Sequence, residues 1–260
     1  MKKFSIGLVI FLIGSFSYAA DLLLNPSATA SAGNNLLLLE PTCSGSFINP
    51  SVNSQGIEFA CSNLYNLNEI TAYYSGVSVQ KQKINFFFHE YFLDNNLYSE
   101  SNSLLGFSYK FKFFEAGLNY RLIYCNVRNY DHDYSSLFDA GFHFKYKRYD
   151  IHASVKNIMR ASVSGEKLPT HIITETAFQL TSFAKISLGL EKQTDFEPII
   201  KSGIAVRPFK ELGLIVSYQQ NPERLGAGAI ISFRKINLTW SILTHTILPL
   251  THHVSLEFKI

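Results

Sequence analysis

The chain has 260 residues, a formal net charge of +3, 14% aromatic residues and only 17% charged residues. Soluble domains usually carry about 25% charged residues, and the apolar content here is too high for intrinsic disorder. So small a charge provides no concentrated basic surface for phosphates, which excludes nucleic acid as the partner.

Residues 1–20 are predicted to be a secretory signal peptide. Lys2 and Lys3 form a basic start, an apolar stretch follows at 6–13, and Ala19 and Ala20 complete a cleavage site. After it, no run reaches the about 18 apolar residues that a membrane-spanning helix needs. An exported, aromatic-rich chain of this kind is therefore expected to be a periplasmic or secreted β-sandwich or an outer-membrane β-barrel.

Residues 21–55 show no alternation of apolar and polar side chains. They contain a run of mostly small residues at 27–33, four leucines at 36–39 and the dipeptide Asn49-Pro50. A helix followed by a turn is predicted, because Pro50 would not sit in a paired central strand. The segment is expected either to fold back into a barrel as a hatch or plug, or to extend as a periplasmic tail.

From residue 56 onward the period of two that is typical of strands dominates. Aromatic side chains occupy every second position of 107–113 and of 142–146, and polar or small residues lie between them. A strand that crosses lipid needs about 9–11 residues, which this pattern supplies. Fourteen strands are predicted, near residues 56–62, 69–79, 82–93, 102–113, 115–128, 136–147, 149–160, 171–181, 184–193, 199–208, 211–220, 225–234, 236–245 and 251–260.

The connections between these strands favour a barrel over a sandwich. Tight turns near 114–115, 148, 182–183, 209–210 and 235 are interleaved with longer, more polar connections at 94–101, 129–135, 161–170, 194–198, 220–224 and 246–249. Short periplasmic turns alternating with longer outer loops are typical of outer-membrane barrels, and an even strand number returns both termini to the periplasm. The predicted fold is all-β, a transmembrane antiparallel β-barrel of about 14 strands over residues 56–260, with a soluble sandwich as the alternative.

A basic stripe is predicted on the lumen side of this barrel. Lys110, Lys112, His143 and Lys145 occupy the polar positions of two alternating segments. They would favour anionic or amphipathic solutes, or they would form a solvated wall paired with lumenal carboxylates such as Glu175 and Glu191.

No catalytic, cofactor or metal site is predicted. His152, Ser154 and Asn157 are similar in spacing to the site of outer-membrane phospholipases, but His152 and Ser154 are expected to face the lumen, away from lipid. His245, His252 and His253 with Glu257 are a conceivable metal set, although polar residues at a hairpin end are the simpler interpretation. Of the three cysteines, Cys43 and Cys61 are left open as a pair, and Cys125 is then single.

Scattered motifs resemble the FadL-like and PorV/PorQ-like outer-membrane barrels. They are Asn49-Pro50-Ser51, Leu190-Glu191-Lys192, Asp195-Phe196-Glu197-Pro198, Val206-Arg207-Pro208, Asn221-Pro222, Gly226-Ala227-Gly228 and Leu250-Thr251-His252. The resemblance implies an N-terminal hatch over 21–55 that includes Asn49 and Pro50, and a non-enzymatic barrel in the outer membrane. FadL-like members pass hydrophobic compounds, so hydrophobic or amphipathic small molecules are expected partners besides the lipid bilayer. PorV/PorQ-like members dock components of a protein secretion system. A structural or adhesive barrel that binds partners through its outer loops is the alternative function.

Overall fold

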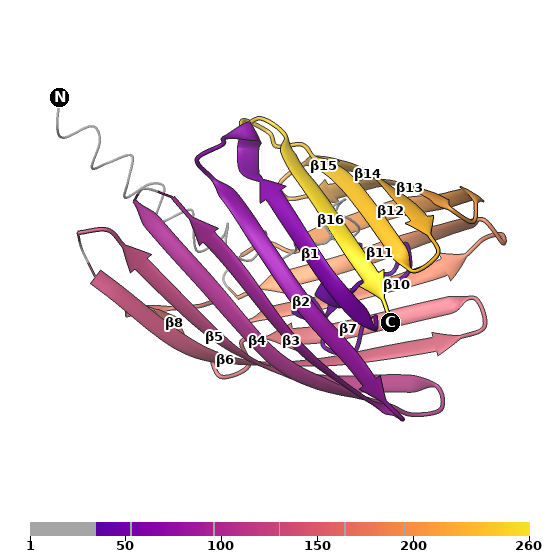
Figure 1. Cartoon of the computed structure of the whole chain (residues 1–260), viewed down its shortest axis with the longest axis horizontal. Helices are drawn as coiled ribbons and strands as arrows, with labels where there is room; N and C mark the ends of the chain where they lie inside the picture. The colour runs from indigo at the N-terminus through magenta and orange to yellow at the C-terminus, as the bar shows by residue number, and fades with distance from the viewer. Residues whose placement is uncertain (1–34, 53, 96, 130, 164, 195) are drawn as a thin grey trace.

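The computed structural model describes residues 35–260 apart from 53, 96, 130, 164 and 195. The predicted signal peptide and residues 21–34 of the predicted hatch lie outside the described residues. Fourteen antiparallel strands form one closed barrel (Figure 1), in which β1 pairs with β2 on one side and with the last strand on the other. The strands are β1 (Gly56–Asn63), β2 (Thr71–Lys81), β3 (Ile84–Asp94), β4 (Tyr98–Lys110), β5 (Phe114–Val127), β6 (Asp131–Tyr146), β7 (Tyr149–Lys156), β10 (His171–Gln179), β11 (Ala184–Gln193), β12 (Ile199–Phe209), β13 (Leu212–Gln220), β14 (Arg224–Phe233), β15 (Ile236–Leu243) and β16 (Thr251–Lys259).

Closure confirms the predicted barrel and rules out the sandwich. The seam runs from the pair Gly56 and Lys259 to the pair Asn63 and His252 without a break. A closed sheet has no free edge, whereas each sheet of a sandwich keeps two. Among the described residues, no helix has the length and apolar character to cross a membrane.

Side chains alternate between the outer and the inner face of the wall, apart from an irregularity in β12 between Val206 and Phe209. On β13, Leu214, Val216 and Tyr218 are 40, 57 and 39% exposed, whereas Ile215 and Ser217 are each 2% exposed. Large apolar side chains are exposed in the same way on every strand of the barrel. The outer wall is thus apolar, as a lipid-facing band requires.

Two strands are longer than the hydrophobic pattern indicated. β4 begins at Tyr98 and β6 at Asp131, so the loops predicted at 94–101 and 129–135 were largely wrong. Polar residues occupy both faces there, so no alternation of hydrophobicity marks the strand. Pairing with β5 nevertheless continues to Tyr98 and Val127 at one edge. The loop at 157–170 carries a small separate hairpin, β8 (Ser162–Val163) with β9 (Glu166–Lys167).

The connections define two ends of the barrel. One, here called the short-turn end, carries the turns at 82–83, 111–113, 147–148, 180–183, 210–211 and 234–235, and both Gly56 and Lys259 lie there. The opposite, long-loop end carries the remaining connections, of which 157–170 is the longest. Residues 64–66 at that end form the short 3-10 helix η2 (Leu64–Asn66).

The described part of the predicted hatch, residues 35–55, is named here the hatch segment, and it supplies much of the apolar core inside the barrel. Its one helical piece is η1 (Cys43–Phe47), a 3-10 helix, and the predicted helix followed by a turn is not tested over residues 21–34, which lie outside the described residues. The leucines at 36–39 form a buried turn because inward-facing small residues of the wall leave room for them. Phe47 packs with Tyr74 and Phe87, Leu36 and Leu37 with Ile173 and Ala177, and Leu38 and Leu39 with Ala205 and Ile215.

Candidate functional site

A pair of glycines in the wall forms the seat of the hatch segment. Gly117 of β5 and Gly141 of β6 are direct cross-strand partners. A Cβ on Gly141 would lie 1.9 Å from Asn49 Oδ1, and one on Gly117 would lie 2.5 Å from the carbonyl oxygen of Pro50. The absence of side chains at these two positions therefore allows the Asn49-Pro50 dipeptide to lie directly against the sheet.

Asn49 is fully buried and its amide is saturated with hydrogen bonds. Its Nδ2 donates to the carbonyl oxygens of Phe142 and Ala153 at 3.1 and 3.0 Å. Its Oδ1 accepts from the backbone N–H and the hydroxyl of Ser51 at 2.9 and 2.6 Å. One side chain thus fixes the hatch turn and ties it to two neighbouring strands.

The histidine and serine of the phospholipase-like spacing also hold the hatch segment. His152 Nδ1 lies 3.1 Å from Asn49 Nδ2, and His152 Nε2 lies 3.1 Å from Glu175 Oε2. Ser154 donates its hydroxyl hydrogen to the carbonyl oxygen of Ile48 at 2.8 Å. Both side chains lie on the inner face and are at most 2% exposed, away from any lipid.

Three carboxylates of the wall receive backbone N–H groups of the hatch segment. An irregular buried segment must find partners for its backbone donors, and a charged acceptor makes such bonds about twice as strong as neutral ones. The pairs are Glu175 with Leu37, Glu58 with Ser44, and Glu257 with Cys43, at N···O distances of 3.2, 2.8 and 3.3 Å.

A cavity of about 330 Å³ opens at the short-turn end beside the hatch segment. Leu37 and Phe183 give it apolar walls, whereas Lys185 and Arg207 add positive charge. Glu40, at its edge, accepts from Arg207 and from Lys259, at 3.5 and 2.8 Å. The cavity therefore combines an apolar surface with a basic rim. The ion pairs of Glu40 attach the hatch segment to that rim.

Two residues of the predicted basic stripe lie at this cavity. His143 Nε2 lies 2.5 Å from Asp150 Oδ1, and Lys185 Nζ lies 3.0 Å from Asp150 Oδ2. Lys145 is 4.0 Å from the same carboxylate, with its side chain 70% exposed. The structure thus brings His143 and Lys145 together at Asp150, an acceptor that sequence reasoning missed.

The other two residues of the stripe lie away from the cavity. Lys110 ends β4 and is exposed, and Lys112 lies in the following turn with its ammonium 5.0 Å from the ring centre of Phe113. A role for the whole stripe in solute selection stays a prediction.

Buried ion pairs cross-link the wall farther inside the lumen. Arg121 and Asp139 form a two-point pair at 2.7 and 3.0 Å, with both side chains at most 2% exposed. The backbone N–H of Asn157 donates to the same Asp139 carboxylate at 2.9 Å. Lys201 forms an ion pair with Glu191, whose other oxygen lies 3.6 Å from His171 Nδ1.

The histidines considered with Glu257 as metal ligands do not gather around it. His253 Nδ1 lies 2.7 Å from the Ser62 hydroxyl, and His245 Nε2 lies 2.8 Å from the Thr251 hydroxyl. Burial, together with the charge of nearby Arg224, lowers the pKa of His245 to about 4, so its ring is neutral near pH 7. The cysteines Cys43, Cys61 and Cys125 are all free thiols.

Comparisons with known proteins identify the fold. No protein-family model matches the sequence, and no curated protein matches it. The toluene transporter TodX of Pseudomonas putida superposes with a TM-score of 0.69 at 10% identity, over 90% of this chain and 98% of that one. The monoaromatic hydrocarbon channel CymD gives a TM-score of 0.65 at 7% identity, over 92 and 98%. These superpositions confirm the predicted barrel fold, which the chain shares with both channels.

Proposed function

We propose that the protein is a non-enzymatic channel of the outer membrane for hydrophobic or amphipathic small molecules, with the hatch segment as its gate. The observation that carries the proposal is an irregular segment, held by polar contacts, that fills the lumen of a barrel with the fold of hydrocarbon channels. The apolar outer wall supports a location in lipid. The predicted signal peptide supports export.

The location is tested by cell fractionation followed by gel migration with and without boiling. We expect the protein in the outer-membrane fraction, and we expect the unboiled protein to migrate differently from the boiled one, because a closed barrel resists detergent at room temperature. A soluble protein in the periplasm would contradict the proposal.

The lipid-facing band gives a quantitative prediction. Val216→Arg, at an exposed mid-strand position of β13, should lower the free energy of unfolding in lipid by about 2–4 kcal/mol, the cost of a basic side chain near the bilayer midplane. Ile247→Arg is the matched control, because Ile247 is 93% exposed in the loop 244–250, outside any strand. Equal losses for the two variants in a denaturant titration would exclude a lipid band at Val216.

Transport is tested by uptake of labelled toluene, the compound named for TodX, into cells whose outer membrane lacks other hydrocarbon channels. Cells that make the protein should take up toluene faster than cells with the empty vector. Deletion of residues 21–55 should raise the initial rate further, because it removes the gate. The channel would be refuted if neither the full protein nor the chain without residues 21–55 increased uptake above that of the empty vector. Both chains must show the heat-dependent shift of a folded barrel for this result to count.

The ion pairs of Glu40 with Arg207 and Lys259 predict that the stability of the protein depends on pH. The hydrogen bond and charge of Lys259, with Arg207 nearby, lower the pKa of Glu40 below its ordinary value of 4.5. A lowered pKa in the folded state stabilises the protein above the unfolded value, and this stabilisation disappears as the pH falls through the folded value. Glu40→Gln should therefore lower the midpoint of thermal unfolding slightly at pH 7, and the difference should begin to shrink as the pH falls below about 4.5. A difference of the same size at pH 7 and pH 3 would contradict the ion pairs of Glu40.

A docking role in protein secretion, as in PorV/PorQ-like barrels, is the second candidate function. It is supported by the filling of the lumen with buried side chains of both wall and hatch segment. A structural or adhesive barrel would use the long-loop end, where the hairpin β8–β9 lies. If the barrel serves in docking or adhesion, removal of the hairpin β8–β9 should abolish binding of the partner protein. If the channel proposal holds, the same removal should leave toluene uptake unchanged.

A further inference from the structure

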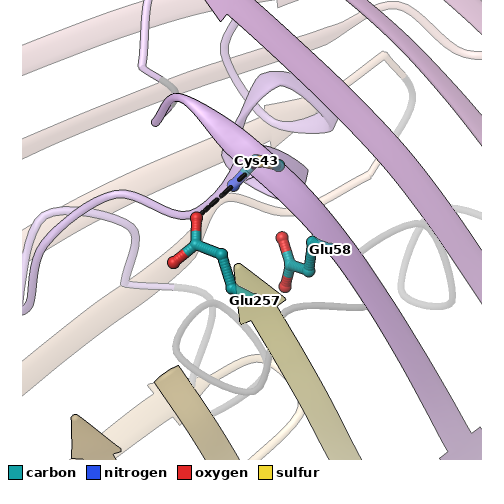
Figure 2. Close-up of side chains that lie close together, drawn as sticks. All are labelled: Cys43, Glu58 and Glu257. Atoms are coloured by element: carbon teal, nitrogen blue, oxygen red, sulfur yellow. Dashed lines mark hydrogen bonds between the residues drawn. The ribbon is translucent and has the colours of Figure 1, made fainter. Parts of the chain in front are cut away.

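A thiol and two carboxylates converge where the hatch segment meets the seam of the barrel. Cys43 belongs to η1, Glu58 to β1 and Glu257 to β16. Figure 2 shows both glutamates beside Cys43, with the hydrogen bond from the Cys43 backbone nitrogen to Glu257 drawn as a dashed line. One potential ligand atom from each residue lies within 4.8 Å of the other two, and all three residues are at most 1% exposed.

The polar groups around this cluster pair its two carboxyl groups with no positive charge. Glu58 Oε2 accepts from the Ser44 backbone, but the fully buried Glu58 Oε1 has no hydrogen-bond partner. Glu257 accepts from Ser54 Oγ and from Asn237 Nδ2. Across the described part of the chain, no lysine, arginine or histidine forms an ion pair with either glutamate. Buried carboxyl groups without a positive partner either take up a proton or bind a cation.

We propose that Cys43, Glu58 and Glu257 bind a zinc-like divalent cation that joins the hatch segment to the two strands closing the barrel. The residue types suit zinc, which accepts thiolate and carboxylate ligands in tetrahedral geometry. Bonds of about 2.3 Å to sulfur and about 2.0 Å to oxygen that meet at a tetrahedral angle place the two atoms about 3.5 Å apart. Cys43 Sγ lies 3.7 Å from Glu257 Oε1, so these two ligands need almost no movement.

The remaining ligands are also within reach. Glu58 Oε1 is the unpartnered oxygen and would complete three protein ligands. The Ser54 hydroxyl lies 3.7 Å from Cys43 Sγ, so that hydroxyl or a water molecule would supply the fourth oxygen. This proposal does not depend on transport, because it concerns only how the hatch segment is fastened.

Cation binding at this site must release a proton. The Cys43 thiol can bind a cation only as a thiolate, so binding replaces the S–H bond with a metal–sulfur bond while the proton leaves to solvent. Affinity should thus increase with pH over the neutral range.

The test uses the full mature chain folded in detergent, with Cys61→Ser and Cys125→Ser so that Cys43 is the only thiol. Titration with Co²⁺ should produce a thiolate-to-metal absorption band, and addition of Zn²⁺ should remove it. The band should be absent when Cys43→Ser is added. Glu58→Gln should weaken Co²⁺ binding by more than about tenfold. Zn²⁺ should also raise the thermal unfolding midpoint of the parent chain but not of the chain with Cys43→Ser.

Heat-dependent gel migration shows that each variant is folded before the titration. The proposal is overturned if the folded parent chain shows no band, because the carboxylates then share a proton only. It is equally overturned if a Co²⁺ band survives Cys43→Ser, or if Zn²⁺ stabilises both chains to the same extent.

Discussion

Asp139→Asn is expected to destabilise the barrel by about 3–5 kcal/mol, the cost of breaking a buried ion pair by removing one of its charges. The substitution keeps the size of the side chain but removes the charge that pairs with Arg121, whose side chain is 2% exposed. It also weakens the acceptor of the Asn157 backbone N–H. The loss is measured as the change in free energy of unfolding in a denaturant titration of the lipid-embedded protein.

Glu69→Gln is the matched control for this prediction. It is the same change from carboxylate to amide, at an exposed position in the loop 64–70. Its effect should stay below about 1 kcal/mol, the range of exposed charges. If the loss in free energy of unfolding for Asp139→Asn were also below about 1 kcal/mol, the pair of Arg121 and Asp139 would not be a stabilising cross-link of the wall.

Gly141→Ala is expected to displace the hatch segment and to raise toluene uptake towards the rate of the chain without residues 21–55. The added methyl group would lie 1.9 Å from Asn49 Oδ1 and 2.7 Å from Pro50 Cδ, so the dipeptide must leave its seat. Overpacking of this kind typically costs about 1–3 kcal/mol. The wall itself should stay closed, because a strand accepts alanine.

Gly189→Ala provides the control for the seat. Gly189 is also buried on the inner face, but its added Cβ would meet only ordinary contacts of 3.4 Å or more. Uptake should therefore match that of the unchanged chain. If Gly141→Ala left uptake unchanged as well, in a folded barrel, the seating of Asn49 and Pro50 would not control passage.

The barrel wall was predictable because each strand carries its own signal. Alternation of apolar and polar residues depends only on neighbours along the chain, so positions such as Leu214 and Val216 could be assigned to the outer face directly. The prediction failed where that local signal ends. The extension of β4 to Tyr98 is polar on both faces, and only pairing with β5 shows that it is a strand.

The interior could not be predicted in the same way. The role of Gly117 and Gly141 depends on which segment lies over them, and their sequence context differs little from that of other strand glycines. Asp150 follows a tight turn, and nothing local indicates that His143 and Lys185 meet there. The one usable signal was the position of a residue in the alternation of its strand. A glutamate such as Glu257, between the apolar Leu256 and Phe258, must face inward and needs a partner there.

The contact between Cys43 and Glu257 spans 214 positions of the chain. Glu257 lies on β16, the strand that closes the barrel against β1, so this anchor of the hatch segment cannot form until the last strand has been inserted. Assembly therefore has a required order. The contacts of the hatch segment with β6, β7 and β10 can form before the barrel closes, whereas its attachment to β16 comes last, although this segment is the first part of the fold to be synthesised.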